Sequence, residues 1–563
     1  MGSRTVSIGA QNFETLILKN NFYIDKTGFI KEWWESDDEV TLITRPRRFG
    51  KTLNMSMLKY FFGIQYQDQG ELFENLDIWA EEKYRNLQGT YPVIFLSFAG
   101  VKSDNYQDAR KQIFQIIESV YTEYNYVIQS DVLEENEKKY CDRIGKDMDI
   151  SDAVIALQRM CGYLNRYHGK KPIILLDEYD TPLQEAYANG YWKELVSFTR
   201  NFFNNTFRTN LYFERAVMTG ITRVSNTSYE VSESMFSDLN NLNVATVTSR
   251  EYASWFGFTE AEVFAAMDEF NLENKEEVKR WYDGFTIGNL RDIYNPWSII
   301  SFLDKKELKP YWTNTSSNKM LSSLLQRASK NIKMQFEDLM RHQSIVSEMD
   351  EEIIFDWLDG DEMSVWSLLL ASGYVKVLRI DGEQYELALT NYEVEKMFSR
   401  MFKTWFRKDV TSYGEFIKAL MVGDMEAMEV YMNRVALSMF SFFDGGNQVS
   451  ENTEPERFYH GFVLGLLVEL EGRYIVTSNR ESGFGRYDVL MQPLNPEDDG
   501  IILEFKVHNP RREKSLEETV QAALKQLSEK QYQQTLLDQG IGREHVRQYG
   551  FAFEGKRVMI GSI

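Results

Sequence analysis

In the first part of the chain, short aliphatic runs alternate with longer stretches in which apolar residues recur three and four positions apart. The runs span residues 40–44, 91–98, 171–180 and 215–223. Such runs are typical of strands buried on both faces, and the periodic stretches between them are typical of amphipathic helices. Repeated alternation of strand and helix predicts a parallel sheet flanked by helices, and therefore an α/β fold.

The middle of the chain has a different pattern. Residues 250–340 have mostly helical spacing and many aromatic side chains, which we interpret as core. Residues 350–395 predict helices followed by two short strands, an order compatible with a small winged-helix unit. Helical spacing continues over residues 393–442, and Asp-Gly-Gly-Asn at 444–447 is a linker signal.

A second alternating pattern ends the sequence. It predicts a helix at 456–470, strands at 473–478, 486–491 and 501–507, a helix at 515–529 and a strand at 549–553. We therefore predict an α/β domain at 1–245, a helical and winged-helix-like region at 246–400, a helical linker at 401–445 and a second α/β domain at 446–563.

Composition narrows the class of protein. The 563 residues include 43% hydrophobic and 14% aromatic residues, enough for packed cores. The formal charge of −22 gives no overall attraction for nucleic acid, so such binding needs a local basic groove. Two cysteines and the lack of an apolar signal segment or membrane-length run predict a soluble cytoplasmic protein without a membrane partner.

The first candidate site follows the first predicted strand. Gly50, Lys51 and Thr52 stand between a basic loop and a stretch of helical spacing at 53–62. Unpaired N–H groups at a helix start attract phosphate. In this setting Lys51 is expected to reach the β- and γ-phosphates of a nucleotide, and the Thr52 hydroxyl is expected to ligate Mg²⁺. The alternative is a basic surface turn.

This loop departs from the usual phosphate-binding pattern. That pattern has a glycine five residues before the Gly-Lys pair, where this chain has Arg45. Arg48 and Phe49 directly precede Gly50, and we include both in the predicted nucleotide-binding segment.

Carboxylates follow the run at 171–180. Asp177 and Glu178 come directly after four aliphatic residues, at the carboxyl end of the predicted strand, where open α/β sheets bind ligands. Asp177 is expected to hold the Mg²⁺ shell, and Glu178 to orient or deprotonate the attacking water. A strand end carrying two solvated acids is the alternative.

Thr222 and Arg223 end the run at 215–223. From a neighbouring strand they are placed to sense a γ-phosphate. A threonine at a strand end is also commonly a local hydrogen-bonding group, and that alternative stays open.

The last domain contains a different set of polar residues. Glu504 and Lys506 share one face of a strand, because strand side chains alternate, and a hairpin turn brings Asp488 beside them. Asp488 and Glu504 are expected to ligate Mg²⁺, and Lys506 to steady the attacking water or the developing charge of phosphodiester hydrolysis. The alternative is a hairpin with a surface Glu–Lys pair.

With these motifs the chain resembles bacterial AAA-ATPase-like proteins that end in a nuclease domain of the PD-(D/E)XK superfamily. The resemblance runs nearly end to end and rests on residues 23–27 (Tyr-Ile-Asp-Lys-Thr), 45–52 (Arg-Pro-Arg-Arg-Phe-Gly-Lys-Thr), 176–180 (Leu-Asp-Glu-Tyr-Asp), 219–223 (Thr-Gly-Ile-Thr-Arg), 281–285 (Trp-Tyr-Asp-Gly-Phe), 294–297 (Tyr-Asn-Pro-Trp), 478–483 (Ser-Asn-Arg-Glu-Ser-Gly) and 504–506 (Glu-Phe-Lys). The resemblance implies that arginine at position 45 is characteristic of the family. It implies a P-loop ATPase core, a helical and winged-helix-like middle, and a restriction-endonuclease-like domain.

The resemblance also implies roles for three further residues. Many superfamily members use a glutamate on the first helix of the nuclease fold, and Glu456 is the candidate, with Glu481 its rival. Gln526 matches a polar position often near the site. The usual proline before the aspartate is absent, because Tyr487 precedes Asp488.

Together these features predict an ATPase that uses ATP and Mg²⁺ and is coupled to a metal-dependent nuclease, with DNA favoured over RNA as the nucleic-acid partner. The alternative is a nucleotide-switched signalling or scaffold protein whose C-terminal fold only binds nucleic acid or a protein. A third interpretation treats Gly50-Lys51-Thr52 as accidental in an α/β protein of another kind. The oligomeric state, including a homo-oligomer, is left open.

Overall fold

The computed structural model describes residues 4–563 apart from 229–230, 235, 237–238, 316–320, 323, 326–327, 341, 350–351, 355–357, 359–361, 408–412, 444–462, 464–466, 468–469, 471, 479–480, 483–484, 487, 496–497, 511, 531 and 555–556. The chain forms two compact units. The first comprises Met1–Ser329 and Ser344–Val394, and the second comprises Lys330–Gln343 and Glu395–Ile563.

A five-stranded parallel sheet organises the first unit. Its spatial order is β2-β3-β4-β1-β7, so β4 lies between β1 and β3. The carboxyl ends of all five strands therefore share one edge, which confirms the predicted parallel α/β sheet. The bounds are β1 (Val40–Thr44), β2 (Val93–Ser97), β3 (Ile173–Asp177), β4 (Ala216–Gly220) and β7 (Leu242–Ala245).

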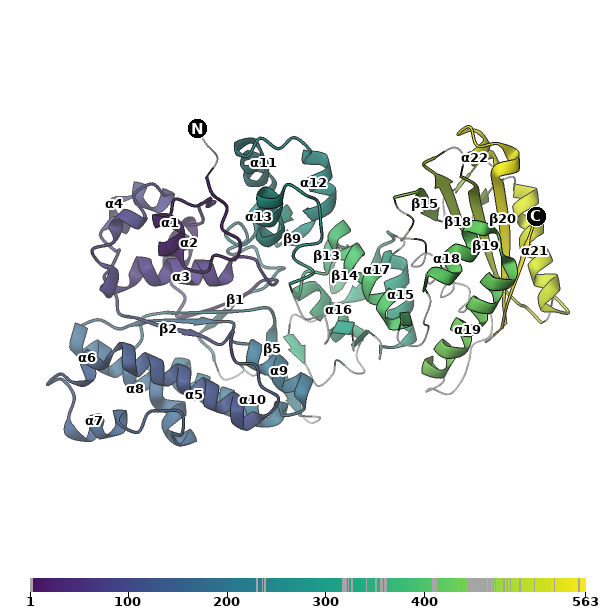
Figure 1. The fold of residues 1–563 in the computed structure, drawn as a ribbon. Coiled ribbons are helices and arrows are strands. Elements are labelled where there is room, and N and C mark those ends of the chain that lie inside the picture. Colours follow the sequence, from purple (N-terminus) through teal and green to yellow (C-terminus); the bar gives the residue numbers. More distant parts are fainter. Residues whose placement is uncertain are drawn as a thin grey trace. The chain divides into compact units, whose positions relative to one another are not determined.

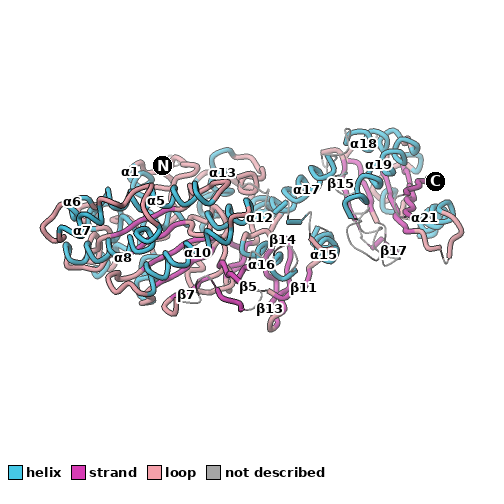
Figure 2. Tube along the Cα trace, turned by 90° about the horizontal axis from the view of Figure 1, so that it is seen from below, coloured by secondary structure: helices cyan, strands magenta, loops and turns pink. Residues whose placement is uncertain are grey.

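Helices cover both faces of this sheet (Figure 1). One face carries α1 (Phe13–Leu18), α2 (Gly28–Ser36), α3 (Lys51–Phe62) and α4 (Glu82–Arg85). The other carries α5 (Tyr106–Glu123), α6 (Asn125–Ile128), α8 (Ile150–His168) and α10 (Trp192–Phe203), and Figure 2 shows α8 and α10 on that side. The elements α7 (Glu135–Cys141), α9 (Thr181–Asn189) and a π-helical turn (Asn204–Arg208) complete the layer, and 3₁₀ turns lie at Ile64–Tyr66, Gly70–Leu72 and Asp77–Ala80.

Aromatic packing holds α2 and α3 to the sheet. Trp33 of α2 and Phe61 and Phe62 of α3 are fully buried in one core with strand residues such as Ile43 and Leu175. These positions face the sheet because apolar residues recur at helical spacing along both helices. Burying an aromatic side chain of this size stabilises the fold by about 2–3 kcal/mol.

The rest of the first unit combines helices with small sheets, in which antiparallel strand pairs predominate. Residues 250–340 were expected to be mostly helical, but β9 and β10 form a hairpin there, whose turn contains Gly288 at φ 56°. The elements are β5 (Arg223–Ser228), β6 (Val231–Ser234), β8 (Phe258–Thr259), α11 (Glu260–Glu269), α12 (Lys275–Tyr282), β9 (Phe285–Ile287), β10 (Leu290–Tyr294), α13 (Pro296–Lys305), β11 (Ile345–Glu348), β12 (Glu352–Ile354), α16 (Glu362–Ala371), β13 (Val375–Asp381) and β14 (Gln384–Leu389).

A mixed five-stranded sheet organises the second unit, in the order β15-β18-β19-β20-β21. Only the β19–β20 pair is parallel. The elements are α15 (Lys330–Met340), α17 (Tyr392–Arg407, whose first residues belong to the first unit), α18 (Tyr413–Val422), α19 (Met425–Phe443), β15 (Tyr474–Ser478), β16 (Glu481–Ser482), β17 (Gly485–Arg486), β18 (Val489–Pro493), β19 (Gly500–Val507), α21 (Leu516–Lys530), α22 (Gln534–Leu537), a 3₁₀ turn (Arg543–His545), β20 (Val546–Glu554) and β21 (Arg557–Ser562).

Both faces of β19 are covered. Phe505 and Phe551 share a core with Phe416 of α18 and Met432 of α19, so helices from the region predicted as a linker pack on this sheet. On the opposite face Ile502 packs with residues of α21. Figure 1 shows α21 beside the strands of this sheet. Alternate residues of β19 therefore point to different helices, and the face under α21 is the one that carries Glu504 and Lys506. Among the described residues, no helix combines the length and apolarity needed to cross a membrane.

Candidate functional site

The loop between β1 and α3 is closed by its own lysine. Gly50 precedes α3 at φ 83°, a left-handed conformation that glycine adopts without strain. Lys51 Nζ donates to the carbonyl oxygens of Arg45 and Pro46, each at 2.8 Å. Burial lowers the pKa of Lys51, and nearby carboxylates, Glu178 first, oppose that shift. The loop thus holds a buried amine beside the N-terminus of a twelve-residue helix.

Thr52 and Asp177, which lie in two separate motifs, are in direct contact. Thr52 Oγ1 donates to Asp177 Oδ2 at 2.8 Å, and Thr219 Oγ1 donates to the other oxygen at 2.7 Å. Asp177 is fully buried, and burial raises its pKa while the two hydroxyl donors lower it. A hydroxyl and a carboxylate side by side form a donor set that suits Mg²⁺.

Glu178 lies at the same edge in a strained backbone conformation. Its φ is 52°, in the left-handed region that non-glycine residues rarely adopt. Its N–H donates to Thr219 Oγ1 at 3.2 Å, and its Oε2 accepts from Thr181 Oγ1 at 3.1 Å. The side chain is half-buried. Strain of this kind is concentrated at functional sites, where the surrounding contacts hold it in place.

Thr222 is engaged by a neighbouring carboxylate. Its N–H and its hydroxyl both donate to Asp180 Oδ2 at 3.0 Å, and the residue is fully buried. Arg223 begins β5 and lines a small cavity with Thr44 and Thr246, at the ends of β1 and β7. The structure therefore places both residues at the sheet edge that carries the loop, with the Thr222 hydroxyl directed to Asp180.

Arg48 and Phe49 face the β9–α13 segment. The Arg48 guanidinium lies 4.3 Å from the ring centre of Trp297, and the Phe49 ring packs edge-on against Phe285 at 4.8 Å. Asn295 Nδ2 donates to the Arg47 carbonyl oxygen at 3.2 Å. The sequence patterns indicated only core packing for these aromatic residues. Their proximity to the loop is a tertiary feature.

The second group of polar residues gathers under α21. Val489 of β18 pairs with Leu503 of β19, which places Asp488 next to Glu504, and Asp488 Oδ2 accepts from the Phe505 N–H at 2.8 Å. The Gln526 amide bridges the other two groups. Its Oε1 accepts from Lys506 Nζ at 2.8 Å, and its Nε2 donates to Glu504 Oε1. Glu504 is only 3% exposed.

Two segments of the sequence match models of known protein families. Residues 7–229 match the model of a family described as a predicted AAA-ATPase. Residues 454–563 match the model of the PD-(D/E)XK nuclease superfamily. The chain carries an AAA-ATPase-like domain and a PD-(D/E)XK domain. Both assignments agree with the resemblance found in the motifs.

The likeness to a full-length relative extends beyond either segment alone. An uncharacterized protein in the vnfD 5'region of Azotobacter chroococcum mcd 1 is 24% identical over 493 residues, covering 84% of this chain and 85% of that protein. The similarity therefore covers most of both chains. The name of this relative indicates no substrate.

One aromatic residue of the PD-(D/E)XK domain was not predicted from the sequence. Tyr532, after α21, is fully buried, and its hydroxyl lies 3.5 Å from Gln526 Nε2. Burial raises the pKa of Tyr532, the hydrogen bond from Gln526 opposes that shift, and the charges of Glu504 and Asp488 add to it. A single tyrosine after a helix has no signal by which sequence reasoning could have found it.

Two predicted acidic positions cannot be placed in this way. Glu456 lies outside the described residues. Glu481 lies in β16, which pairs with β17, and its side chain is not among those described. The helix-borne glutamate of the PD-(D/E)XK domain therefore stays a prediction.

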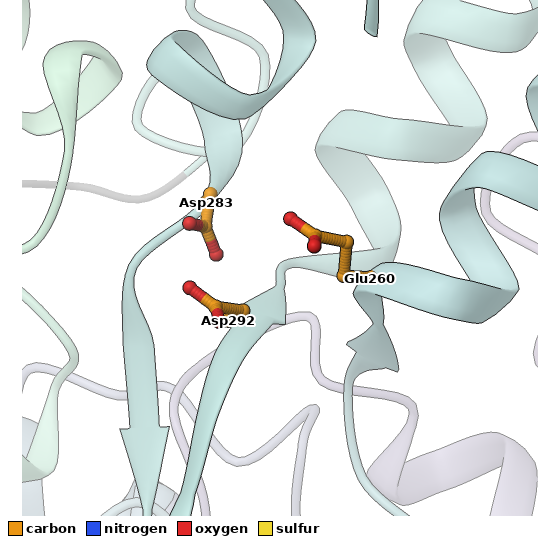
Figure 3. Close-up of side chains that lie close together, drawn as sticks. All are labelled: Glu260, Asp283 and Asp292. Atoms are coloured by element: carbon orange, nitrogen blue, oxygen red, sulfur yellow. The ribbon is translucent and has the colours of Figure 1, made fainter. Parts of the chain in front are cut away.

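A cluster of three acids follows the AAA-ATPase-like segment, and sequence reasoning missed it. Glu260, Asp283 and Asp292 come from α11, the end of α12 and β10, and their carboxylate oxygens lie within 4.8 Å of one another (Figure 3). Lys279 forms an ion pair with Glu260 and lies 3.8 Å from Asp292. Burial raises the pKa of Asp283 to about 7, and Asp292 adds to the shift. The cluster is formed by a hairpin and two helices whose contact no local pattern predicts.

Proposed function

We propose that the first unit binds and hydrolyses ATP with Mg²⁺ at residues 48–52 and the adjoining sheet edge. The contact between Thr52 and Asp177 carries the proposal, because it joins the loop and the acidic strand end at one point. Lys51 and the N–H groups at the start of α3 bind the phosphates, and Thr52 with Asp177 holds Mg²⁺, which neutralises charge on the transferring phosphoryl group. Glu178 orients the attacking water or accepts its proton.

The groups at the end of β4 fit a sensing role. Asp180 holds Thr222 by two hydrogen bonds, and this fixes the start of β5 and hence Arg223 beside the loop. We propose that Arg223 responds to the γ-phosphate and that Thr222 acts by fixing the backbone on which Arg223 is carried.

For the second unit we propose metal-dependent cleavage of nucleic acid, with DNA favoured as the substrate. Asp488 and Glu504 hold Mg²⁺, which supplies the Lewis acid and activates water for phosphodiester hydrolysis. Lys506, held by Gln526, steadies the attacking water or the developing charge. The support is that a buried glutamate, a lysine and an aspartate converge on one face of β18 and β19.

With two proposed activities on one chain, we propose a coupled mechanism, in which the nucleotide state of the first unit gates cutting by the second. In this proposal α16, β13 and β14 act as a winged-helix-like part of the middle region. The net charge of −22 favours a second candidate, a nucleotide-switched scaffold whose C-terminal fold binds nucleic acid or a protein without cutting.

Paired variants test these proposals. ATP turnover with Mg²⁺ is expected for the wild type and is abolished in Lys51→Ala, so unaltered turnover in that variant excludes the assigned site. Glu504→Ala and Lys506→Ala should each stop cleavage of DNA while ATP turnover continues. If the wild type cleaves neither DNA nor RNA with Mg²⁺ or Mn²⁺, yet changes its nucleic-acid affinity or its assembly when ATP binds, the scaffold candidate is favoured.

A further inference from the structure

Arg45 begins the loop, at the position where the usual phosphate-binding pattern has a glycine. Its side chain is 0% exposed. One guanidinium nitrogen donates to the carbonyl oxygens of Thr44, Ala245 and Thr246 at 2.8, 2.9 and 2.7 Å, and the other donates to that of Glu251 at 3.0 Å. Its guanidinium carbon also lies 5.6 Å from the ring centre of Phe256.

These contacts join two segments that are far apart in the sequence. Ala245 ends β7, and Thr246 and Glu251 belong to the segment that follows it, 200 residues or more beyond Arg45. A planar group with five donors can satisfy several carbonyl oxygens at once, and a lysine cannot reproduce that geometry. The arginine side chain therefore ties the start of the loop to the carboxyl end of the edge strand.

The backbone of Arg45 has a second set of contacts. Its N–H donates to the Gly220 carbonyl oxygen at 3.1 Å, which extends the β1–β4 ladder, and its own carbonyl oxygen accepts from Lys51 Nζ at 2.8 Å. Arg45 thus contacts the end of β7 through its side chain and Lys51 through its backbone carbonyl oxygen. A glycine here would leave carbonyl oxygens of residues 245–251 without these donors. The loss of hydrogen bonds in a buried site would lower the stability of the loop conformation.

We infer that Arg45 is a positioning residue, which sets the loop conformation and the place of Lys51 by anchoring the loop to the segment after β7. This inference rests on the proposed ATP site. In this chain the buried Arg45 side chain holds the loop through contacts with residues 245–251. The usual pattern has a glycine, which has no side chain to make such contacts, at this position.

The deciding variant is Arg45→Gly, which restores the usual glycine at this position. If the arginine is only a tolerated departure, this variant binds nucleotide as well as the wild type or better. If Arg45 positions the loop, the Kd for a fluorescent ATP analogue with Mg²⁺ rises by about tenfold or more, because several hydrogen bonds to a charged group are lost. Added methylguanidinium, which can enter the vacated space, should restore part of the affinity.

Arg215 supplies a matched control. It is also buried, donates to the Trp34 carbonyl oxygen at 2.7 Å and pairs with Asp37. It directly precedes β4, however, and so lies at the amino ends of the parallel strands, away from the loop. Arg45→Lys and Arg215→Lys should both lower the unfolding midpoint of the nucleotide-free protein. Only Arg45→Lys should weaken nucleotide binding, and it also serves if Arg45→Gly does not fold.

The outcomes separate the two proposals. No nucleotide binding by the wild type overturns the proposed ATP site and this inference with it. Wild-type binding with an unchanged Kd in Arg45→Gly or Arg45→Lys overturns this inference alone. An equal loss of affinity in Arg215→Lys also overturns it, because general destabilisation then explains the effect.

Discussion

The Thr52 hydroxyl lies 2.8 Å from Asp177 Oδ2, although 125 positions separate the two residues in the sequence. The contact exists because β1 and β3 lie on either side of β4 in one parallel sheet, so that their carboxyl ends point the same way. Each residue belongs to its own motif, and the sheet brings the two motifs to one edge.

Replacing Thr52 by valine tests this pair. Valine keeps the shape of threonine but lacks the hydroxyl, so we expect the affinity for Mg-ATP to fall by about 10- to 100-fold, because Mg²⁺ loses one of its proposed ligands and Asp177 loses a hydrogen-bond donor. Thr52→Ser is the control and should stay close to the wild type. Titration calorimetry with Mg-ATP measures both, and equal affinities for the two variants contradict the assignment.

Glu178→Gln should separate binding from turnover. The amide keeps an oxygen able to accept from Thr181 Oγ1 but is a poor base, so turnover should fall by about 10²- to 10⁴-fold. Binding of Mg-ATP should persist and raise the unfolding midpoint, since a ligand that binds only the native state stabilises it. Wild-type turnover in this variant removes Glu178 from the mechanism.

Gln526→Leu should weaken nucleic-acid cleavage without affecting ATP turnover. The amide bridges Lys506 and Glu504, and its loss leaves their polar groups less well oriented, so the rate should drop by about 10- to 100-fold. Gln534→Leu is the matched control, because Gln534 is exposed and its side-chain amide donates to Asp538, four positions along the chain. Equal effects of the two substitutions would rule out a role for the bridge.

Stability should decline as the pH rises through neutrality, in part because of Glu393. This glutamate is buried and accepts from Ser298 Oγ at 2.7 Å, and burial raises its pKa from 4.5 to about 7. A carboxyl with a raised folded-state pKa contributes stability that is complete below about 4.5 and is lost as the pH passes through about 7.

The predicted loss of stability with rising pH can be checked with variants. Thermal unfolding from pH 5 to 8 should show a steeper fall of the midpoint in the wild type than in Glu393→Gln. Asp283 has its pKa raised to about 7 as well, so Asp283→Asn should flatten the profile in the same direction. A profile unchanged by both substitutions contradicts the buried, raised-pKa state of these acids.

The sequence by itself determined the strands and the chemistry at their ends. Runs such as 40–44 and 173–177 are rich in aliphatic residues and buried along their whole length, because both faces of a central strand are covered, and that requirement is local enough to see in the residue order. Lys51, Asp177 and the Glu504–Lys506 pair were visible for the same reason, since a polar residue that follows or interrupts such a run needs a partner.

Only the tertiary structure decided which partners those residues have. The carbonyl oxygens of Ala245, Thr246 and Glu251 around Arg45, the bridge from Gln526 to β19, and the acids at 260, 283 and 292 come from separate segments of the chain. Periodicity reports burial and the face on which a side chain lies, whereas these contacts depend on strand order and on how helices pack across the sheet. That order comes from long-range packing, which leaves no local pattern in the sequence.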